Sequence, residues 1–379
     1  MNGDLRYCRS ALPKVSRTFA QAIRILPPSL NRPVLVAYLL CRVADTVEDD
    51  TSLPPQMRVD ALRELARAVS GGTGALRVEG ILAQLAGMSS WRREDDEAAA
   101  GWELAARVRS VLACLEALRE DQRDEIAACL RDMTEGMARF VAMEARSAGP
   151  AAPAASRAAA GTLETAGDLE AYSDCVAGRV GRFLYGLFVR DLRIAGEERR
   201  GRLLSLATPF GLGLQYTNIL QDVAADRRRG WIYLPRSAAR ARGVDVEDLF
   251  DPAHRDAAVA VVKDLAATAL GYLDKAFEFT LLIPRRAPRV RLFCLMPLCL
   301  AAATLTALWG NRDLMERKVK VGRPEVRRLA RAALLRCASN GALARFYETE
   351  TRTLRARVEA HGVPMPGLTR PLTKVSVEE

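Results

Sequence analysis

Apolar residues recur three and four positions apart along most of the chain, and few stretches alternate β-branched with polar residues. The first spacing places apolar side chains on one face of a helix, whereas alternation would place them on one face of a strand. Ala, Leu, Arg and Glu, which are compatible with helices, dominate the same segments. The pattern therefore predicts an all-α protein.

Two helix boundaries can be placed near the N-terminus. Ser16 is a favourable N-cap for a helix that runs to Leu26, and the following Pro27 would end it. Pro33 fits the first turn of a second helix, which we expect to continue to about Asp50.

One uncharged stretch, from Leu292 to Trp309, reaches the lower limit of length for a membrane span. Pro297 and the many Ala and Thr residues in it favour a buried helix instead. Charged residues precede any apolar run at the N-terminus, so we expect no secretory signal.

The composition is that of a soluble globular protein, because 49% of the 379 residues are hydrophobic and 27% are charged. The length permits two or three domains or one large helical domain, and we expect a single domain over residues 1–379. A flexible loop is expected at about 148–161, which is rich in Ala and Pro, and a loosely ordered tail at about 362–379.

The chain is basic, with 56 Lys and Arg residues against 46 Asp and Glu residues and a net charge of +10. A basic surface suits nucleic acid, an anionic membrane face or phosphorylated substrates, although an Arg-rich proteome would produce the same excess. Because we find no nucleic-acid recognition motif, we expect no nucleic-acid partner.

The eight cysteines are scattered, and none is separated by two residues from another as thiolate metal sites require. They are typical of small core residues in a reducing cytosol. Since His254 and His361 are the only histidines, any divalent metal must be held by oxygen ligands.

A first acidic motif, from Arg42 to Asp50, follows an apolar segment and holds four carboxylates within six residues. Asp45 and Asp49 are one helical turn apart, so they share a face and repel each other. They also lie near a helix C-terminus, where the macrodipole adds negative potential. This is an unfavourable place for acids unless a metal compensates.

A second acidic motif repeats the four-residue spacing at Asp222 and Asp226, again just after an apolar run. Either motif alone is explained by a solvated helix end. Two such pairs can face each other across a helix bundle and hold Mg²⁺ through oxygen atoms, which leaves positions open for phosphate oxygens. Together the motifs predict diphosphate chemistry.

These residues resemble the squalene and phytoene synthases, the head-to-head isoprenyl diphosphate synthases, over roughly residues 14–325. Further matching segments, in chain order, are Ser16 to Phe19, Tyr38 with Arg42, Tyr172 with Val176 to Gly181, Gln215 with Asn218, and Ile232 to Pro235. The segments Phe293 to Pro297, Ala301 to Thr304, Trp309 to Asn311 and Lys318 to Arg323 are more similar to the squalene synthase branch. The eukaryotic members end in a membrane anchor that this sequence lacks, which favours a soluble, bacterial-type member.

The resemblance implies a role for each matching residue. The metal ligands would be Asp45, Glu48, Asp49, Asp222 and Asp226. The catalytic residues would be Tyr172, Phe293 and Phe19. Substrate would be bound by Ser16, Arg17, Tyr38, Arg42, Val176, Ala177, Gly181, Gln215, Asn218 and Pro297. NADPH, for which no dinucleotide fingerprint is present, would contact Asn311, Lys318, Lys320 and Arg323.

The family resemblance also implies a single helical bundle of the isoprenoid synthase type with a central cavity, and Mg²⁺ and NADPH as cofactors. The implied reaction joins two farnesyl diphosphates through presqualene diphosphate and reduces the product to squalene. A phytoene synthase-like C20 condensation and a non-reducing synthase of presqualene diphosphate or hydroxysqualene stay open. We expect a cytoplasmic monomer, with peripheral contact to the anionic inner face of the membrane as one consequence of its basic charge.

Three positions leave questions open. Ala177 and Gly181 share a helix face, where small residues suit either a channel for a prenyl chain or close helix packing. Ala225 replaces the Glu that the family usually has before the last aspartate of the second motif, and Trp231 replaces an Arg. The second change removes a cation near the phosphate, which Arg228 or Arg229 could offset.

Overall fold

The computed structural model describes residues 3–71, 74–91, 96–148 and 163–362. These residues form helices and no strands, which confirms the predicted all-α class. They divide into two compact units, 1–161 and 162–379, which are considered one at a time. The single-domain expectation stays a prediction. The expected flexible loop at 148–161, apart from the end of one helix, and the expected tail beyond residue 362 lie outside the described residues.

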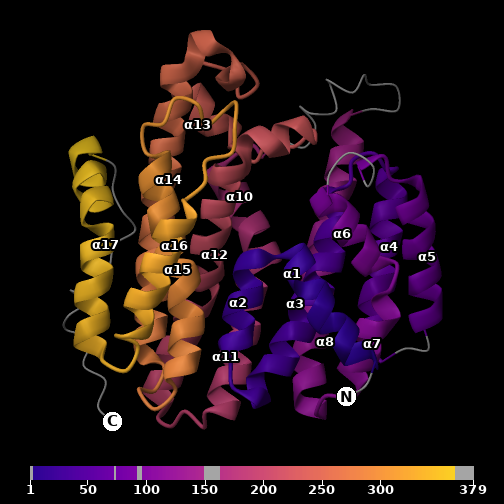
Figure 1. Ribbon diagram of the computed structural model, residues 1–379. Helices are drawn as coiled ribbons and strands as arrows, with labels where there is room; N and C mark the ends of the chain where they lie inside the picture. The colour runs from indigo at the N-terminus through magenta and orange to yellow at the C-terminus, as the bar shows by residue number, and fades with distance from the viewer. Residues whose placement is uncertain (1–2, 72–73, 92–95, 149–162, 363–379) are drawn as a thin grey trace. The chain divides into compact units, whose positions relative to one another are not determined.

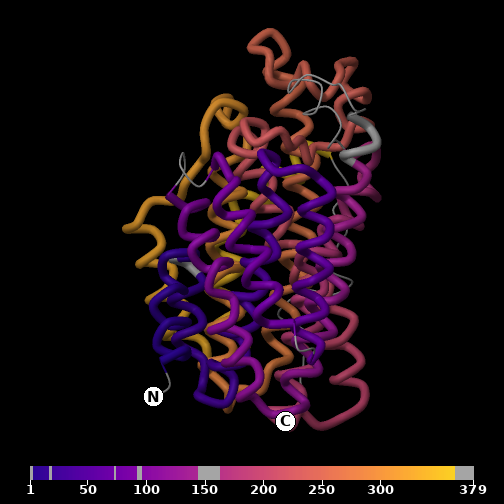
Figure 2. Tube along the Cα trace, turned by 90° about the vertical axis from the view of Figure 1, so that its right-hand side faces the viewer, coloured from indigo at the N-terminus to yellow at the C-terminus, as the bar shows by residue number. Residues whose placement is uncertain are grey.

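The first unit consists of helices joined by short connections (Figure 1). Their bounds are α1 Gly3–Val15, α2 Arg17–Ile25, α3 Pro28–Asp49, α4 Pro55–Val69, α5 Ala75–Met88, α6 Asp96–Ala105, α7 Val108–Glu116 and α8 Glu120–Ala148. Figure 2 shows the long helices of this unit, drawn in indigo to magenta, running nearly alongside one another. Helix α3 packs against α1, α4, α6, α7 and α8, so it forms the centre of the unit.

The predicted start of α3, with Pro33 in the first turn, is wrong. The helix begins at Pro28, which takes the first-turn position where a missing N–H costs nothing, and Pro33 lies inside the helix. Pro33 cannot donate to the carbonyl of Ser29 one turn earlier. The buried Gln122 side chain instead donates its Nε2–H to that carbonyl at 3.3 Å, which explains why the helix continues through Pro33.

The second unit contains longer helices, with α12 packed along α14 (Figure 1). Its elements are α10 Ala166–Ser173, the π-helix η2 Asp174–Gly178, α11 Arg179–Asp191, α12 Glu197–Arg228, α13 Arg236–Arg240, the 3₁₀-helices η3 Asp248–Phe250 and η4 Pro252–His254, α14 Arg255–Leu282, α15 Pro288–Leu308, α16 Arg323–Leu334 and α17 Asn340–His361.

A buried polar group joins α14 to α17 in this unit. The carboxylate of Asp274 accepts hydrogen bonds from Arg355 Nη1 at 2.9 Å and from the Tyr347 hydroxyl at 3.1 Å. Because the charge of Asp274 is buried, these donors are needed to offset the loss of water.

Helix α15 contains the long uncharged stretch. By length and composition it could cross a membrane, but 72% of its most apolar window is buried inside the protein. This burial agrees with the predicted buried helix. Pro297 lies within α15 and is itself buried.

Candidate active site

The first acidic motif lies on a partly exposed face of α3, whose other faces are mostly buried. Tyr38, Arg42, Asp45 and Asp49 are half-buried, whereas the residues between them, such as Val43, are buried, apart from Cys41. Spacings of three and four residues place these four side chains in one row on the helix. The first unit therefore presents Tyr38, Arg42, Asp45 and Asp49 together on one face of α3.

Helix α2 contributes to the same region. The Ser16 hydroxyl accepts a hydrogen bond from the backbone N–H of Phe19 at 3.2 Å, which confirms the predicted N-cap. The Phe19 and Tyr38 ring centroids are 5.4 Å apart. Burial raises the pKa of Tyr38 to about 12, although its hydrogen bond with Ser16 opposes the shift. Arg17 is the first residue of α2 and its side chain lies outside the described part.

The charges on this face are incompletely balanced. Burial raises the pKa of Asp45 to about 7, because loss of water outweighs the nearby Arg42 cation, and Asp49 adds to the shift. Arg42 Nη2 lies 3.2 Å from Glu97 Oε1, while its buried Nε has no hydrogen-bond partner among the described residues. The α3 face thus combines the Asp45 carboxylate, which a bound cation would stabilise, with the Arg42 Nε–H, which can donate to an anion.

Glu48 lies away from this row. Its side chain is buried with the core of the first unit, and its backbone carbonyl accepts a hydrogen bond from the buried Arg58 at 2.7 Å. The supporting role in metal binding that the family resemblance implies for Glu48 stays a prediction.

Sequence reasoning did not single out Asp50, which fixes the end of the motif. The Asp50 carboxylate is 1% exposed and accepts hydrogen bonds from Trp102 Nε1 at 2.9 Å and from the Ser52 backbone N–H at 3.1 Å. The Ser89 hydroxyl donates to the same carboxylate. These donors come from different segments, so no local pattern indicated this role.

The second acidic motif has the same arrangement on α12. Gln215, Asp222 and Asp226 are half-buried and Asn218 is exposed, whereas neighbouring residues such as Ile219 are buried. The second unit therefore also presents its predicted substrate and metal residues along one helix face.

The segment after α15 contacts this face. Lys318 Nζ lies 2.6 Å from Asp222 Oδ1, and Gln221 Nε2 donates to the backbone carbonyl of Val319 at 2.8 Å. Lys318, predicted to contact NADPH, thus pairs with a predicted metal ligand. Sequence reasoning missed both contacts because they join positions that are far apart in the chain.

Tyr172 lies in the last turn of α10, which begins with a capping box between Thr165 and Asp168. Its side chain is 4% exposed, and its hydroxyl donates a hydrogen bond to the Tyr233 hydroxyl at 3.0 Å. The two rings stack with centroids 4.9 Å apart, and the Trp231 ring stacks on the other side of Tyr233. Tyr233, which sequence reasoning named only as part of a matching segment, thus fixes the hydroxyl of Tyr172.

The π-helix η2 follows directly, and small residues there allow close backbone contact. A Cβ atom on Gly181 would lie 1.9 Å from the Ala207 carbonyl oxygen, and one on Gly211 would lie 2.1 Å from that of Ala177. These distances favour close helix packing over a channel for Gly181. Val176 is buried, whereas the side chain of Ala177 is half-buried.

Phe293 belongs to an aromatic cluster in the second unit. It is 4% exposed and meets the ring of Phe188 edge to face, with centroids 6.1 Å apart. Phe188 in turn contacts Phe279, which lies next to Phe210. The sequence offered no sign of these three partners, because isolated phenylalanines in apolar helices are ordinary core residues.

The other predicted NADPH contacts are accessible. Lys320 and Arg323 are exposed, and the side-chain oxygen of Asn311 accepts a hydrogen bond from the backbone N–H of Asp313 at 2.9 Å. Asn311 therefore shapes the turn after α15, which leaves its amide group available.

Trp231, at the position where the family usually has Arg, is a core residue. It is 4% exposed and lines a small cavity with Asp226 and Phe250. Its indole Nε1 has no hydrogen-bond partner within the described ranges. Trp231 thus supplies no cation at this position, whereas Arg228 is exposed at the end of α12.

Each acidic motif fits a divalent ion in its choice of ligands. Two aspartates at four-residue spacing supply hard oxygen donors, and Mg²⁺ is usually held by one or two carboxylates together with water and substrate phosphates. In the part of the chain that the structure describes, no three His, Cys, Asp or Glu residues gather closely enough to form an all-protein metal site. The donor set therefore suits a metal completed by a phosphorylated substrate.

Comparison with known proteins agrees with this arrangement. A family model described as squalene/phytoene synthase matches residues 12–328. The squalene synthase of Eremothecium gossypii is 27% identical over 323 residues, which cover 84% of this chain and 66% of that protein. The squalene synthase of Schizosaccharomyces pombe is 27% identical over 318 residues, 84% of this chain and 62% of that protein. The chain thus spans slightly less than two thirds of the length of these relatives.

Among solved structures, a complex of TcSQS with the ligand BPH1237 has a TM-score of 0.75 at 25% identity, with 95% of this chain and 96% of that chain covered. The likeness defines an all-α protein with the isoprenoid synthase fold. With most of its length matched by one family model, the chain belongs to the squalene/phytoene synthase family.

Proposed function

We propose that this protein is an Mg²⁺-dependent prenyltransferase that joins two farnesyl diphosphates head to head through presqualene diphosphate and reduces the product to squalene with NADPH. The observation that carries the proposal is the pair of half-buried aspartate faces, one near the C-terminal end of α3 and one near that of α12. The names of the relatives support the choice of substrate.

The first task of the site is to release diphosphate. Bound Mg²⁺ would neutralise the leaving group, held by Asp45 and Asp49 on α3 and by Asp222 and Asp226 on α12, with Glu48 in support. Arg17 and Arg42 would bind phosphate oxygens, since a guanidinium offers a planar set of donors. The buried Nε of Arg42, without a partner among the described side chains, supports this role. Further polar contacts to the substrate would come from Ser16 and Tyr38 in the first unit and from Gln215 and Asn218 in the second.

The second task is to protect the allylic cation that remains when the carbon–oxygen bond breaks. Aromatic faces stabilise a cation without attacking it, a role we assign to Phe19 and Phe293. Val176, Ala177, Gly181 and Pro297 would shape the apolar surroundings. Tyr172 would help to remove the proton that leaves as the cyclopropane ring closes, with the released diphosphate as its final acceptor, and the bond to Tyr233 holds the hydroxyl in one orientation.

The reductive half of the reaction rests on Asn311, Lys318, Lys320 and Arg323 as contacts of NADPH, the source of hydride. The ion pair between Lys318 and Asp222 gives weight to a non-reducing rival, because Lys318 then acts on the diphosphate side of the site. A protein with this composition would work in the cytoplasm as a monomer, with access to the membrane for its apolar product.

The test is incubation with farnesyl diphosphate or its C20 homologue, with and without NADPH, followed by mass analysis of products. We expect presqualene diphosphate or hydroxylated products without NADPH, and squalene with it. Reaction of the C20 substrate alone would favour a phytoene-type synthase, and indifference to NADPH would favour the non-reducing rival. Tyr172→Phe should stop presqualene diphosphate formation while the circular dichroism spectrum stays that of the parent.

A further inference from the structure

Helix α16 exposes a basic row that ends in leucines. Arg327 and Arg331 are exposed and four residues apart, and Leu335 continues the row at the C-cap with 82% exposure. The adjacent Leu334 is 58% exposed. An open groove of about 480 Å³ runs along this side, lined by Pro324, Arg327, Arg328, Arg331, Ala332, Leu335 and Arg336.

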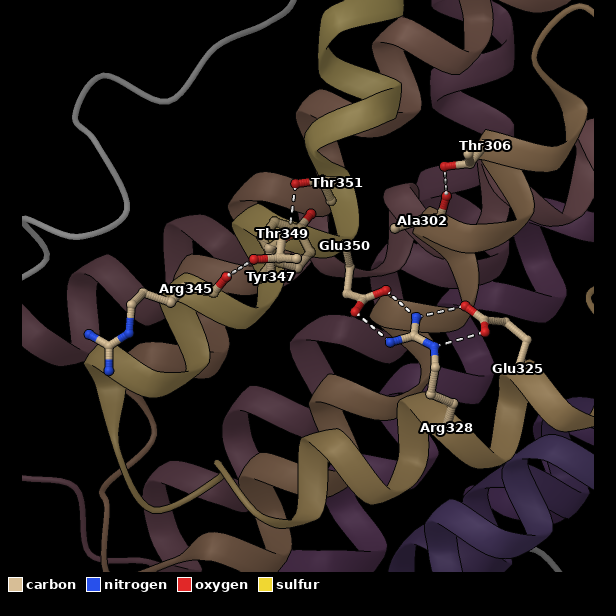
Figure 3. Close-up of polar contacts among 9 residues, drawn as sticks. All are labelled: Ala302, Thr306, Glu325, Arg328, Arg345, Tyr347, Thr349, Glu350 and Thr351. Atoms are coloured by element: carbon tan, nitrogen blue, oxygen red, sulfur yellow. Dashed lines mark hydrogen bonds and ion pairs between the residues drawn. The ribbon is translucent and has the colours of Figure 1, made fainter.

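Within the part of the chain that the structure describes, no acidic side chain neutralises the charge of this row. Arg328, one position away, is held between Glu325 at 2.8 Å and Glu350 at 2.8 Å, which ties α16 to α17 (Figure 3). Neither Arg327 nor Arg331 has an acidic partner within the described ranges. Two positive charges therefore remain available to a ligand outside the chain.

The rest of α16 is fixed in place. Leu329 is 4% exposed and Ala333 is fully buried, so the inner face of the helix packs on the second unit. Cys337, just beyond the helix, is also buried. Leu334 and Leu335 are thus exposed to solvent, although the same helix buries other apolar residues in the core. Large exposed apolar groups beside unpaired arginines mark an interaction surface.

We propose that this α16 surface, made of Arg327, Arg331, Leu334 and Leu335, docks on the anionic face of a lipid bilayer. Arginines attract anionic headgroups, and leucines beside them can enter the boundary between headgroups and acyl chains. Nucleic acid is a poorer match, because the row carries leucines where stacking aromatic side chains would be needed. The inference rests on the proposed function in one respect, since a C30 hydrocarbon product requires an apolar phase to receive it.

The test is co-sedimentation of the full chain, without substrate, with vesicles of phosphatidylglycerol and phosphatidylcholine in equal parts. We expect binding that weakens with salt and is lost on pure phosphatidylcholine. Arg327→Gln with Arg331→Gln should lower the partition coefficient about 30-fold, the change expected from two basic residues near an anionic surface. Leu334→Ser with Leu335→Ser should lower it about 10-fold.

Matched controls distinguish the effect of the α16 surface on vesicle binding from the effects of net charge and of exposed leucines elsewhere. Arg131→Gln with Arg139→Gln removes two exposed charges from α8, and Leu76→Ser removes a leucine that is 67% exposed on α5. Both controls should bind the vesicles within about twofold of the parent, whereas equal losses in the controls and the α16 variants would overturn the proposal.

Two further results would also overturn it: binding to anionic vesicles that the α16 variants do not reduce, or binding of the α16 row to duplex DNA in preference to vesicles. Because vesicle binding is measured without substrate, its failure is distinct from a failure of the proposed reaction. Product formation by the α16 variants in detergent should match that of the parent.

Discussion

In α3 the cation that lowers the pKa of Asp45 is Arg42, which comes from the same helix, whereas in α12 the cation paired with Asp222 is Lys318, which comes from the segment after α15. The two motifs have the same four-residue spacing and the same half-buried face. Burial leaves Asp45 with a raised pKa despite Arg42, while Asp222 has an ammonium group at 2.6 Å. Asp45 therefore has a raised pKa beside its cation, whereas Asp222 pairs with an ammonium group that a metal would have to displace.

The largest expected effect is on turnover, and it tests the metal-binding role that we propose for both motifs. Asp45→Asn and Asp222→Asn should each lower turnover by at least about 100-fold, the scale of a lost electrostatic stabiliser. Steady-state rates with Mg²⁺ measure this, and Asp124→Asn, an exposed acid on α8, serves as the control. Near-parental rates in EDTA, or in either motif variant, would contradict a metal role for these aspartates.

The next prediction concerns the free energy of unfolding, which substitutions in the two motifs should change in opposite directions. Because the pKa of Asp45 is raised from 3.8 to about 7 in the folded protein, the folded state binds this proton more tightly, and the contribution of Asp45 to stability falls as the pH rises from about 4 to about 7 and then stays constant. Asp45→Asn should therefore raise the free energy of unfolding of the metal-free protein at pH 8 by about 1–2 kcal/mol, allowing for solvent screening.

Chemical denaturation at pH 8 and pH 5 measures this gain, which should shrink at the lower pH because protonated Asp45 no longer carries a buried charge. Asp222→Asn should instead lower the free energy of unfolding by up to about 1 kcal/mol, since it removes the pair with Lys318. Changes of the same sign in both variants would remove the distinction between the motifs.

The smallest expected effect is on Mg²⁺ affinity, because Lys318 and the metal ion would compete for Asp222 on α12. Lys318→Ala should tighten Mg²⁺ binding by about 2- to 5-fold, because the ion no longer has to displace an exposed ammonium group. Isothermal titration without NADPH measures the affinity. Lys320→Ala, which removes an exposed charge from the same segment without a contact to Asp222, should leave the Mg²⁺ affinity unchanged. Weaker binding in Lys318→Ala would mean that Lys318 supports the metal site.

Much of the local structure followed from the sequence. Ser16 caps α2 as predicted, because capping depends on residues only three positions apart. The aspartate faces of α3 and α12 followed from helix spacing alone. The start of α3 did not, since the stability of a helix that runs through Pro33 depends on Gln122 in another helix.

Contacts between distant segments limited the prediction of the site in the same way. The family resemblance assigned Lys318 to a cofactor, but no pattern in the chain could place its ammonium group on Asp222. Small residues at Gly181 fitted a channel and close packing equally well until the backbone of Ala207 was located. The sequence also gave no reason to separate Glu48 from its acidic neighbours, because its burial depends on the helices that surround α3.

The π-helix η2 between α10 and α11 has a consequence for how this protein can change. A π turn holds one more residue than an α turn, so loss of one residue from 174–178 would restore ordinary helical hydrogen bonding. Because the π turn accommodates its extra residue within that one turn, α10 and α11 would keep nearly the same rotation relative to each other after the deletion. Tyr172 would therefore still face Tyr233, so residues 174–178 are a place where the chain can lose one residue and keep this hydrogen bond.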